Sequence, residues 1–273
     1  MWPLERHRGV LRVGRDRIEL WRGTAQGLVL HASSEVECAD APQAVDLERP
    51  LAQVLRRETQ PASRSARRVD IVLESAWLPV MAFDVGGSLS TRNRAESLLR
   101  HHMGELHEPR EPFELRLDYG AGDRQALGYA LAPGVKRAVI AQVTAAGLET
   151  ASVQPAFAWG WSRLARHRRR KRSGWWSWSE QDRCLVAQWH RGRVVTLNAG
   201  AAPTNADIDI ARAVDIEAAR HGVLQELDVV HAGWHAGAGK PSADPRLFRA
   251  GVAASVATSQ AHAAATTRHA GVA

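Results

Sequence analysis

Residues 139–155, VIAQVTAAGLETASVQP, contain a helix, a turn and a strand in direct succession. Val139 and Val143 lie four positions apart, as residues do on one face of a helix. Gly147 is typical of the residue that ends a helix, because glycine accepts the left-handed backbone conformation found there. The residues after it predict a short strand, and Pro155 suits the first turn of another helix. This stretch therefore predicts that helices and strands alternate along the chain.

The same alternation extends in both directions and predicts a mixed α/β protein of two subdomains with antiparallel-rich sheets. Predicted strands are Gly9–Val13, Arg17–Trp21, Gly27–His31, Val69–Leu73, Leu78–Phe83, Phe113–Leu117, Ala126–Leu131, Glu149–Val153, Trp175–Ser179, Cys184–Trp189, Val194–Asn198 and Gln225–Val230. Predicted helices are Asp46–Arg57, a long helix capped by Ser90 that ends before Pro109, Gly134–Ala146, Pro155 to about Leu164, and a helix capped by Thr204 that ends near His221.

We expect the chain to be organised in four parts. Residues 1–66 form the strand-rich beginning of the first subdomain and end in a polar linker at Thr59–Ala66. Residues 67–166 form a second block of strands and helices. Residues 167–250 form a third block with three strands, a helix and a final strand. Residues 251–273 are a low-complexity tail composed mostly of Ala, Thr, Ser and Val.

Positive charge is concentrated in one segment, residues 163–172. This segment holds seven of the 36 Lys and Arg residues and no acid, so the other 29 basic side chains balance the 29 acidic ones. The net charge of +7 is therefore a local feature. A broad basic face, which would attract nucleic acid over the whole surface, is not predicted.

Trp175, Trp176 and Trp178 follow the basic segment, and the two features together have three interpretations. The arginines could bind the phosphates of a nucleic acid while the tryptophans stack on its bases. They could instead meet an anionic membrane surface, where tryptophan also favours the interface. Alternatively, the arginines form a solvated loop and the tryptophans are the inward face of the next strand. We expect a partner or membrane contact formed by Arg166, Arg168, Arg169, Arg170, Lys171, Arg172, Trp175, Trp176 and Trp178.

Other features indicate a cytoplasmic protein. No stretch approaches the roughly 20 apolar residues that span a bilayer, and the first ten residues contain no apolar signal segment. Cys38 and Cys184 lie far apart and are expected to be reduced, with Cys184 in the core. Because the sequence shows no membrane span, we expect any association with an inner membrane to be peripheral.

The sequence contains no convincing active site. Asp84–Ser88, DVGGS, could hold Mg²⁺ and a phosphate, but a turn between a strand and the following helix explains it better. His101 and His102 point about 100° apart on a helix and are not expected to share one metal ion. His231 and His235 are expected in a loop. We therefore predict no catalytic residue, no metal site and no cofactor, with ATP and Mg²⁺ as the one alternative.

In the order of its elements, the chain from residue 9 to residue 235 resembles the actin-like ATPase-fold assembly proteins, which have a ribonuclease H-like fold. The resemblance depends on the three opening strands and their helix, on residues 139–155, and on the strands from Trp175 to Asn198. It extends to the PilM-type protein of type IV pili and to the cytoplasmic domain of the GspL-type protein of type II secretion. It implies a two-subdomain fold and a scaffold role in a pilus or secretion platform.

Two positions depart from the pattern of that family. ATP-binding members carry Asp-x-Gly at the first strand, whereas this chain has Arg12-Val13-Gly14, so a base replaces the acid that would position the metal. Near the last strand the expected glycine pair appears only as Ala232-Gly233-Trp234, whose indole would crowd a nucleotide. Both departures argue against nucleotide hydrolysis.

The sequence therefore predicts a non-catalytic cytoplasmic scaffold or assembly component of a type IV pilus or type II secretion-like machine. The predicted partner is an inner-membrane assembly protein of the PilN type or an anionic membrane surface. One alternative is a nucleic-acid-binding protein that uses residues 163–178. The other is an atypical ATPase that uses Asp84–Ser88.

Overall fold

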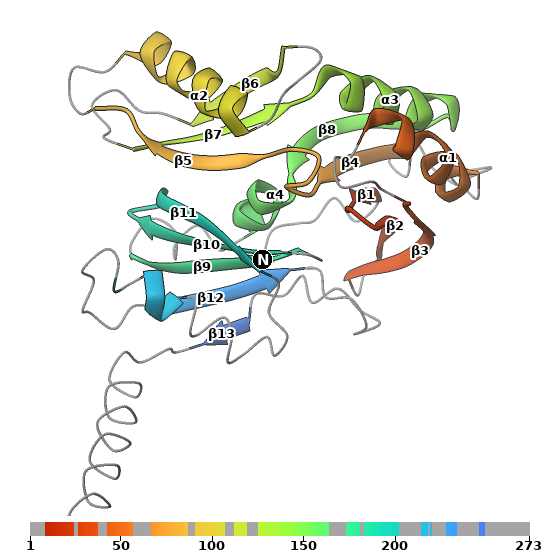
Figure 1. Cartoon of the computed structure of the whole chain (residues 1–273). Coiled ribbons are helices and arrows are strands. Elements are labelled where there is room, and N and C mark those ends of the chain that lie inside the picture. The colour runs from red at the N-terminus through yellow and green to blue at the C-terminus, as the bar shows by residue number, and fades with distance from the viewer. Residues whose placement is uncertain are drawn as a thin grey trace, which may run out of the picture.

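The computed structural model describes residues 9–24, 27–37, 43–56, 67–86, 91–106, 112–118, 125–163, 173–180, 183–201, 214–217, 219, 228–233 and 246–248. Within these residues the strands form two five-stranded sheets and one three-stranded sheet (Figure 1). No helix in this part of the chain is long and apolar enough to cross a bilayer.

The N-terminal sheet has the strand order β3-β2-β1-β4-β8. Its strands are β1 (Gly9–Val13), β2 (Arg17–Thr24), β3 (Gly27–Glu35), β4 (Arg68–Leu73) and β8 (Glu149–Pro155). Strand β1 lies in the centre, antiparallel to β2 and parallel to β4. Every residue of β1 is buried, which requires that both faces of the sheet are covered.

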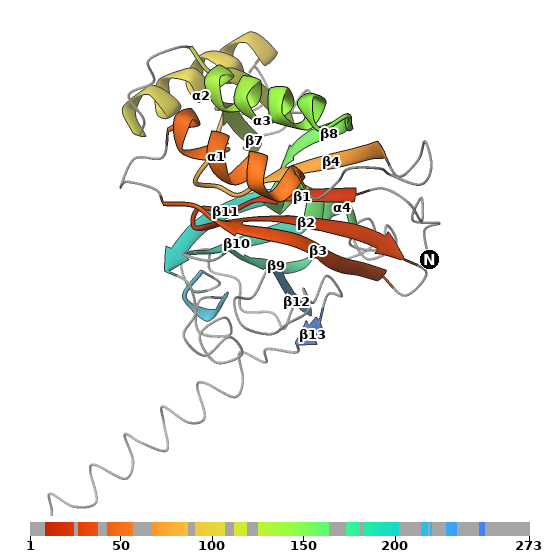
Figure 2. The ribbon, with the colours of Figure 1, turned by 90° about the vertical axis from the view of Figure 1, so that its right-hand side faces the viewer.

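Two helices cover one face of the N-terminal sheet, α1 (Ala44–Leu55) and α3 (Pro133–Ala145) (Figure 2). Successive side chains of a strand point to opposite faces. Leu11 and Val13 of β1 accordingly join the core under these helices, with Leu51 of α1 and Val139 of α3. Val10 points to the opposite face and joins a second core. Arg12 lies on that same face.

The C-terminal sheet has the strand order β11-β10-β9-β12-β13. Its strands are β9 (Gly174–Ser179), β10 (Arg183–His190), β11 (Arg193–Ala201), β12 (Asp228–Gly233) and β13 (Arg246–Phe248). Neighbouring strands are antiparallel except for the parallel pair of β9 and β12. Strand β13, at the edge, was not predicted from the sequence.

Helix α4 (Ala156–Arg163) packs between the N-terminal and C-terminal sheets (Figure 1). It contacts β4 and β8 on one side and the C-terminal sheet on the other. Its Gly160 allows the close approach, because a Cβ atom there would lie 2.2 Å from the ring of Trp178. A larger residue at position 160 would force the helix away from the sheet.

The small sheet has the order β5-β7-β6 and is antiparallel. It consists of β5 (Val80–Asp84), β6 (Glu114–Asp118) and β7 (Gln125–Leu131), with α2 (Arg92–Leu106) packed against it. Leu99 and Met103 of α2 pack with Phe83 of β5 in a separate core. This sheet also contacts the C-terminal sheet through β11.

The predicted mixed α/β class is confirmed, and the predicted strands and helices up to Asn198 are present with boundaries shifted by a few residues. Gly147 ends α3 as expected, with φ of 72° and a bond from the Leu148 N–H to the Val143 carbonyl of 3.1 Å. The helix predicted to begin at Asp46 begins two residues earlier, at Ala44. Gln43 is the N-cap of α1, and Asp46 lies in the first turn, where its carboxylate accepts the Gln43 N–H at 2.8 Å.

Some predictions lie outside the described residues: the linker Thr59–Ala66, the caps Ser90 and Thr204, Cys38 and the tail 251–273. Thr91, directly before α2, accepts the Arg94 N–H on its hydroxyl at 3.3 Å. Of the predicted helix near 204–221, residues 214–217 and 219 are described and helical. The division into four parts stays a prediction.

Candidate functional site

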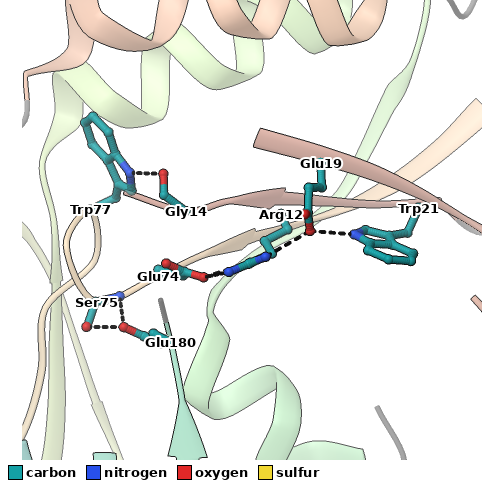
Figure 3. A network of polar contacts seen from close by, with 8 residues as sticks. All are labelled: Arg12, Gly14, Glu19, Trp21, Glu74, Ser75, Trp77 and Glu180. Carbon is teal, nitrogen blue, oxygen red and sulfur yellow. Dashed lines mark hydrogen bonds and ion pairs between the residues drawn. The ribbon is translucent and has the colours of Figure 1, made fainter. Parts of the chain in front are cut away.

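The loops that follow β1, β4 and β9 meet at one end of the sheets (Figure 3). Strands β1 and β4 are parallel neighbours, so their carboxyl ends lie side by side. The Glu74 N–H donates to the Val13 carbonyl at 3.0 Å, and the Trp77 indole N–H donates to the Gly14 carbonyl at 2.9 Å. These bonds fix the position of the loop after β4 against the β1–β2 turn.

Arg12 is the central side chain of this site. Its Nε donates to Glu74 Oε1 at 2.7 Å, its Nη1 donates to Glu19 Oε2 at 2.9 Å, and its Nη2 also bonds Glu74 Oε1. All three residues are buried. Glu19 lies directly across from Arg12 on β2 and also accepts the indole N–H of Trp21 at 3.1 Å. The guanidinium is therefore held between two carboxylates inside the protein.

This pairing keeps Arg12 charged although it is buried. Desolvation lowers the pKa of Arg12, but the negative charges of Glu74 and Glu19 raise it by more, and its pKa is raised overall. A buried charge is tolerated only when it is paired and hydrogen-bonded. The two carboxylates and the guanidinium therefore depend on one another.

Glu180 connects this site to the C-terminal sheet. It follows β9, in a turn closed by a bond from the Glu180 N–H to the Arg183 carbonyl of 2.8 Å. Its Oε2 accepts the backbone N–H of Ser75 at 2.9 Å and also the Ser75 hydroxyl. Because Ser75 lies in the loop after β4, this contact joins the two large sheets. We call Arg12, Glu19, Glu74, Ser75 and Glu180 the polar cluster.

Glu180 holds a proton at neutral pH. Burial and, next, the negative charge of Glu74 raise the pKa of Glu180 to about 8, although the bonds from Ser75 and the charge of Arg183 lower it in part. Its Oε1 is buried and, within the described residues, has no hydrogen-bond partner. A neutral acid is the form of Glu180 that this setting favours.

In the polar cluster, each carboxyl group bonds a neighbouring group of the same cluster. Glu74 and Glu19 are engaged with Arg12, and Glu180 is engaged with Ser75. In the described part of the chain, no group of three His, Cys, Asp or Glu side chains is arranged to hold a metal ion. The arrangement can join the two halves of the protein.

A second contact between the two large sheets is apolar. We call Trp159 and Trp161 of α4, with Trp176, Trp178 and Trp189 of the C-terminal sheet, the tryptophan cluster. Trp176 and Trp178 stack with centroids 5.9 Å apart, and Trp161 lies 5.7 Å from Trp189 and 6.2 Å from Trp176. This cluster packs with Val10, Trp21 and Val72 of the N-terminal sheet.

The contact role predicted for the three tryptophans that follow the basic segment is therefore corrected by the structure. Trp175, Trp176 and Trp178 are buried, and a membrane or partner could not reach them in the folded chain. The alternation of β9 turns Trp176 and Trp178 to the same face, toward α4, which agrees with the interpretation as the inward face of a strand. Arg166, Arg168, Arg169, Arg170, Lys171 and Arg172 lie outside the described residues, and their contact role stays a prediction.

The other candidates take structural roles. The Asp84 carboxylate accepts the Gly86 N–H at 2.7 Å, as in a turn after a strand. His101 and His102 both reach Glu105, at 3.2 and 3.7 Å, so the helix does bring them toward a shared neighbour. His231 lies in β12, which corrects the predicted loop, whereas His235 lies outside the described residues.

Cys184 lies in the core, as predicted. Burial raises the pKa of the Cys184 thiol to about 11, which leaves it protonated and unreactive at neutral pH. The polar cluster was not predicted from the sequence, although one signal was present. Arg12 is the one charge in Gly9–Val13, and Glu19 lies between the apolar residues Ile18 and Leu20, so the two charges of opposite sign could have indicated a buried pair.

Comparisons with known proteins bear on the fold. No protein-family model matches the chain, and no curated protein sequence matches it. A Bacteroides thetaiotaomicron protein with an actin-like ATPase fold and unknown function is similar at a TM-score of 0.53 and 12% identity, over 87% of this chain and 86% of that chain. The PilM-PilN type IV pilus biogenesis complex gives a TM-score of 0.53 at 10% identity, over 83% of this chain and 81% of that chain.

A third structure is the cytoplasmic domain of EpsL, an inner-membrane component of the type II secretion system of Vibrio cholerae. It gives a TM-score of 0.47 at 14% identity, over 83% of this chain and 82% of that chain. The actin-like ATPase fold that the sequence resemblance implied is confirmed by the first two structures.

Proposed function

We propose that this chain is a non-catalytic assembly component of a type IV pilus or type II secretion-like machine, and that it docks a cytoplasmic segment of an inner-membrane partner of the PilN type. The fold it shares with the PilM-PilN complex supports the proposal. The same fold serves both enzymes and assembly proteins, so the fold alone does not decide between them. The polar cluster favours the second class.

The observation that carries the proposal is the pairing of Arg12. The sequence resemblance implies an acid at this position in members that bind a metal and a nucleotide. Here the position carries a cation, and the two nearby carboxylates, Glu19 and Glu74, neutralise it at 2.9 and 2.7 Å. A metal ion would have to displace a guanidinium held by both acids. The loss of that buried pairing would be costly.

The basic segment 163–172 is the proposed contact with an anionic membrane surface or with the partner. The residue after it, Ser173, bonds the imidazole Nδ1 of His190 at 2.6 Å. His190 is exposed and precedes the β10–β11 turn, where Arg191 and Arg193 are also exposed. Basic side chains of the hairpin therefore lie near Ser173, the residue that follows the basic segment in the sequence. Clustered cations near anionic headgroups gain roughly 1 kcal/mol each.

Partner docking is tested by titrating the full chain with a peptide that covers the cytoplasmic segment of a PilN-type protein, measured by calorimetry. We expect saturable binding that Mg-ATP does not change. A scrambled peptide of the same composition is the control. Failure to bind, together with failure to recover any inner-membrane protein by co-purification from membranes, would remove this proposal.

The membrane contact is tested separately with the variant Arg168→Glu, Arg169→Glu, Arg170→Glu. We expect loss of co-sedimentation with vesicles that contain phosphatidylserine and unchanged melting temperature, because charge reversal removes the attraction without altering the core. Equal co-sedimentation of the variant and the unmutated chain would show that the segment is an ordinary solvated loop.

The two alternative functions, nucleic-acid binding and ATP hydrolysis, make predictions that differ from those of the proposal. A nucleic-acid-binding protein should lose affinity steeply with salt, and the burial of Trp176 and Trp178 removes them as stacking platforms for bases. An ATPase should gain about 2.7 kcal/mol of stability when Mg-ATP is present at 100 times its dissociation constant. We expect no such rise in melting temperature.

A further inference from the structure

Strand β3 forms one edge of the N-terminal sheet and exposes apolar side chains. Val29 is 53% exposed and Leu30 is 41% exposed. Within the described residues, the other large exposed hydrophobic side chains are Val45 on α1 and Ile216. The two residues on β3 are the ones that adjoin each other, and they lie where backbone N–H and C=O groups face outward.

A bulge limits this apolar stretch to a short segment. Trp21 of β2 pairs with Leu30, but Leu20 pairs with Ala32, so His31 is an extra residue on β3. Bulges bend and twist an edge strand. The regular part of the edge before the bend is therefore Gly27–Leu30, and His31 closes it.

Charged residues and proline are two devices that natural proteins use to prevent strands from pairing at an edge, and short or bulged edge strands are others. The β3 edge has the bulge at His31, which limits pairing to the residues before it, but this segment carries neither charge nor proline. Gly27–Ser34 contains no Lys, Arg, Asp, Glu or Pro. The edge strand β6, by contrast, exposes Glu114, Arg116 and Asp118 in alternation. The β6 edge is protected by charge, and the β3 edge is not.

We propose that the β3 edge pairs with the β3 edge of a second copy of this chain. In an antiparallel pair, directly opposite residues share a face of the sheet. The register that places Val29 opposite Val29 of the second copy also places Leu28 opposite Leu30 and Gly27 opposite His31. Leu28 and Leu30 share a face, because Leu28 packs in the core that contains Trp21 and Leu30 pairs with Trp21.

This register is self-complementary in chemistry as well as in symmetry. It pairs apolar side chains with apolar side chains and puts no charge opposite a like charge, which would be destabilising. A two-fold axis through the Val29 pair satisfies the rule that a symmetric dimer uses the same patch on both copies. The two N-terminal sheets would then form one continuous sheet across the axis.

The short contact predicts a weak dimer. Five residues on each side bury far less than the roughly 800 Å² per partner of a standard interface. We therefore expect association in the micromolar range. The dimer would be populated where the protein is concentrated.

The first test measures the mass of the full chain by sedimentation equilibrium up to about 200 µM, well above micromolar dissociation constants of small interfaces. We expect the mass to rise with concentration from 29.9 kDa toward twice that value. Val29→Lys should weaken association at least tenfold, because it places two like charges opposite each other. Val45→Lys is the matched control, since Val45 is 63% exposed and lies on α1; it should leave association unchanged.

The second test determines the register by oxidative cross-linking. Val29→Cys should give a covalent dimer on a non-reducing gel. Opposite Cβ atoms lie about 4.5–5.5 Å apart, and closer in non-hydrogen-bonded pairs, so a small adjustment brings them to the roughly 3.5–4.5 Å that a disulfide spans. Ser33→Cys, exposed on the same strand, should not cross-link to itself in this register. The unmutated chain, which retains Cys38 and Cys184, is the background control.

Three results would overturn the proposal. The chain could stay at 29.9 kDa over the whole concentration range. Val29→Lys and Val45→Lys could weaken association equally. Ser33→Cys could cross-link while Val29→Cys does not, which would place the contact in a different register. None of these results depends on whether a PilN-type partner binds.

Discussion

The polar cluster and the tryptophan cluster both join the N-terminal sheet to the C-terminal sheet, but they do so by different physics. The polar cluster uses two ion pairs of Arg12, one carboxyl–hydroxyl contact and one neutral acid. The tryptophan cluster uses ring contacts with centroids 5.7 to 6.3 Å apart. The first depends on matched partners and the second on buried area.

This difference shows which contact stabilises the joined state and which makes it specific. Burial of apolar area contributes in proportion to the area removed from water. A buried ion pair roughly balances its Coulomb gain against desolvation, yet removal of one partner is costly. The tryptophan cluster should therefore carry most of the stability. The polar cluster should fix how the two sheets meet.

The largest effect is expected for Trp178→Ala. Trp178 is buried against Gly160 of α4 and between Trp159 and Trp176. Its loss should lower the free energy of unfolding by about 3–5 kcal/mol, through lost burial and the cavity that remains. Urea unfolding measures this change. Trp161→Ala is the matched control, and its half-buried side chain should cost clearly less. Equal costs would contradict the role given to burial.

The second prediction compares the loss of Arg12 alone with the loss of Arg12 and both of its carboxylate partners. Arg12→Met leaves Glu19 and Glu74 buried without their cation, and it should cost about 3 kcal/mol. Adding Glu19→Gln and Glu74→Gln removes the two charges while it keeps acceptors for hydrogen bonds. The triple variant should recover more than half of the loss in urea unfolding at pH 7. If the triple variant is less stable than Arg12→Met, the ion pair itself is a major source of stability.

The third prediction concerns how the free energy of unfolding depends on pH through Glu180 of the polar cluster. Glu180 keeps its proton in the folded chain up to a pKa of about 8, whereas its ordinary value is 4.5. A raised folded pKa contributes stability that is fully present below pH 4.5 and is lost as the pH rises toward 8. Glu180→Gln keeps a neutral side chain and should remove this loss.

The measurement for Glu180 is the free energy of unfolding of both chains at pH 5, 6.5 and 8. The difference between them isolates Glu180 from the histidines, which titrate in both. We expect Glu180→Gln to gain roughly 3 kcal/mol on the unmutated chain across this range. A constant difference across pH would mean that Glu180 is ionised in the folded chain.

The smallest effect is expected for Ser75→Ala. This change removes the hydroxyl contact to Glu180 but keeps the backbone N–H bond of 2.9 Å. The free energy of unfolding should fall by about 1 kcal/mol, the usual net worth of one hydrogen bond. The pKa of Glu180 should rise further, because the Ser75 hydroxyl helps to lower it. A loss as large as that of Trp178→Ala would reverse the comparison between the two clusters.

The sequence predicted the fold well where local chemistry determines it. Gly147 ended a helix as predicted, because glycine accepts the left-handed conformation found there. Pro155, predicted to open the next helix, is the last residue of β8, directly before α4. The apolar alternation of β9 placed Trp176 and Trp178 on one face. The sequence alone did not decide whether that face was buried. Burial depends on α4, which approaches through Gly160.

The polar cluster could not be predicted from the sequence, because its members are far apart along the chain. Arg12 and Glu74 are separated by 62 positions, and Ser75 and Glu180 by 105. Their meeting depends on the parallel pairing of β1 with β4 and on the packing of two sheets. The replacement of an acid by Arg12 was visible. Its two carboxylate partners became visible only in the folded chain.

The separations within the tryptophan cluster also determine how this protein emits light. Indoles with ring centres 5.7 to 6.3 Å apart exchange excitation energy before they fluoresce. Light emitted by the folded chain will therefore lose much of its polarisation, even though each ring is held rigidly. If the C-terminal sheet moves away from α4, the exchange slows and the polarisation of the emission rises. The five indoles thus form a built-in optical reporter of whether the two halves are joined.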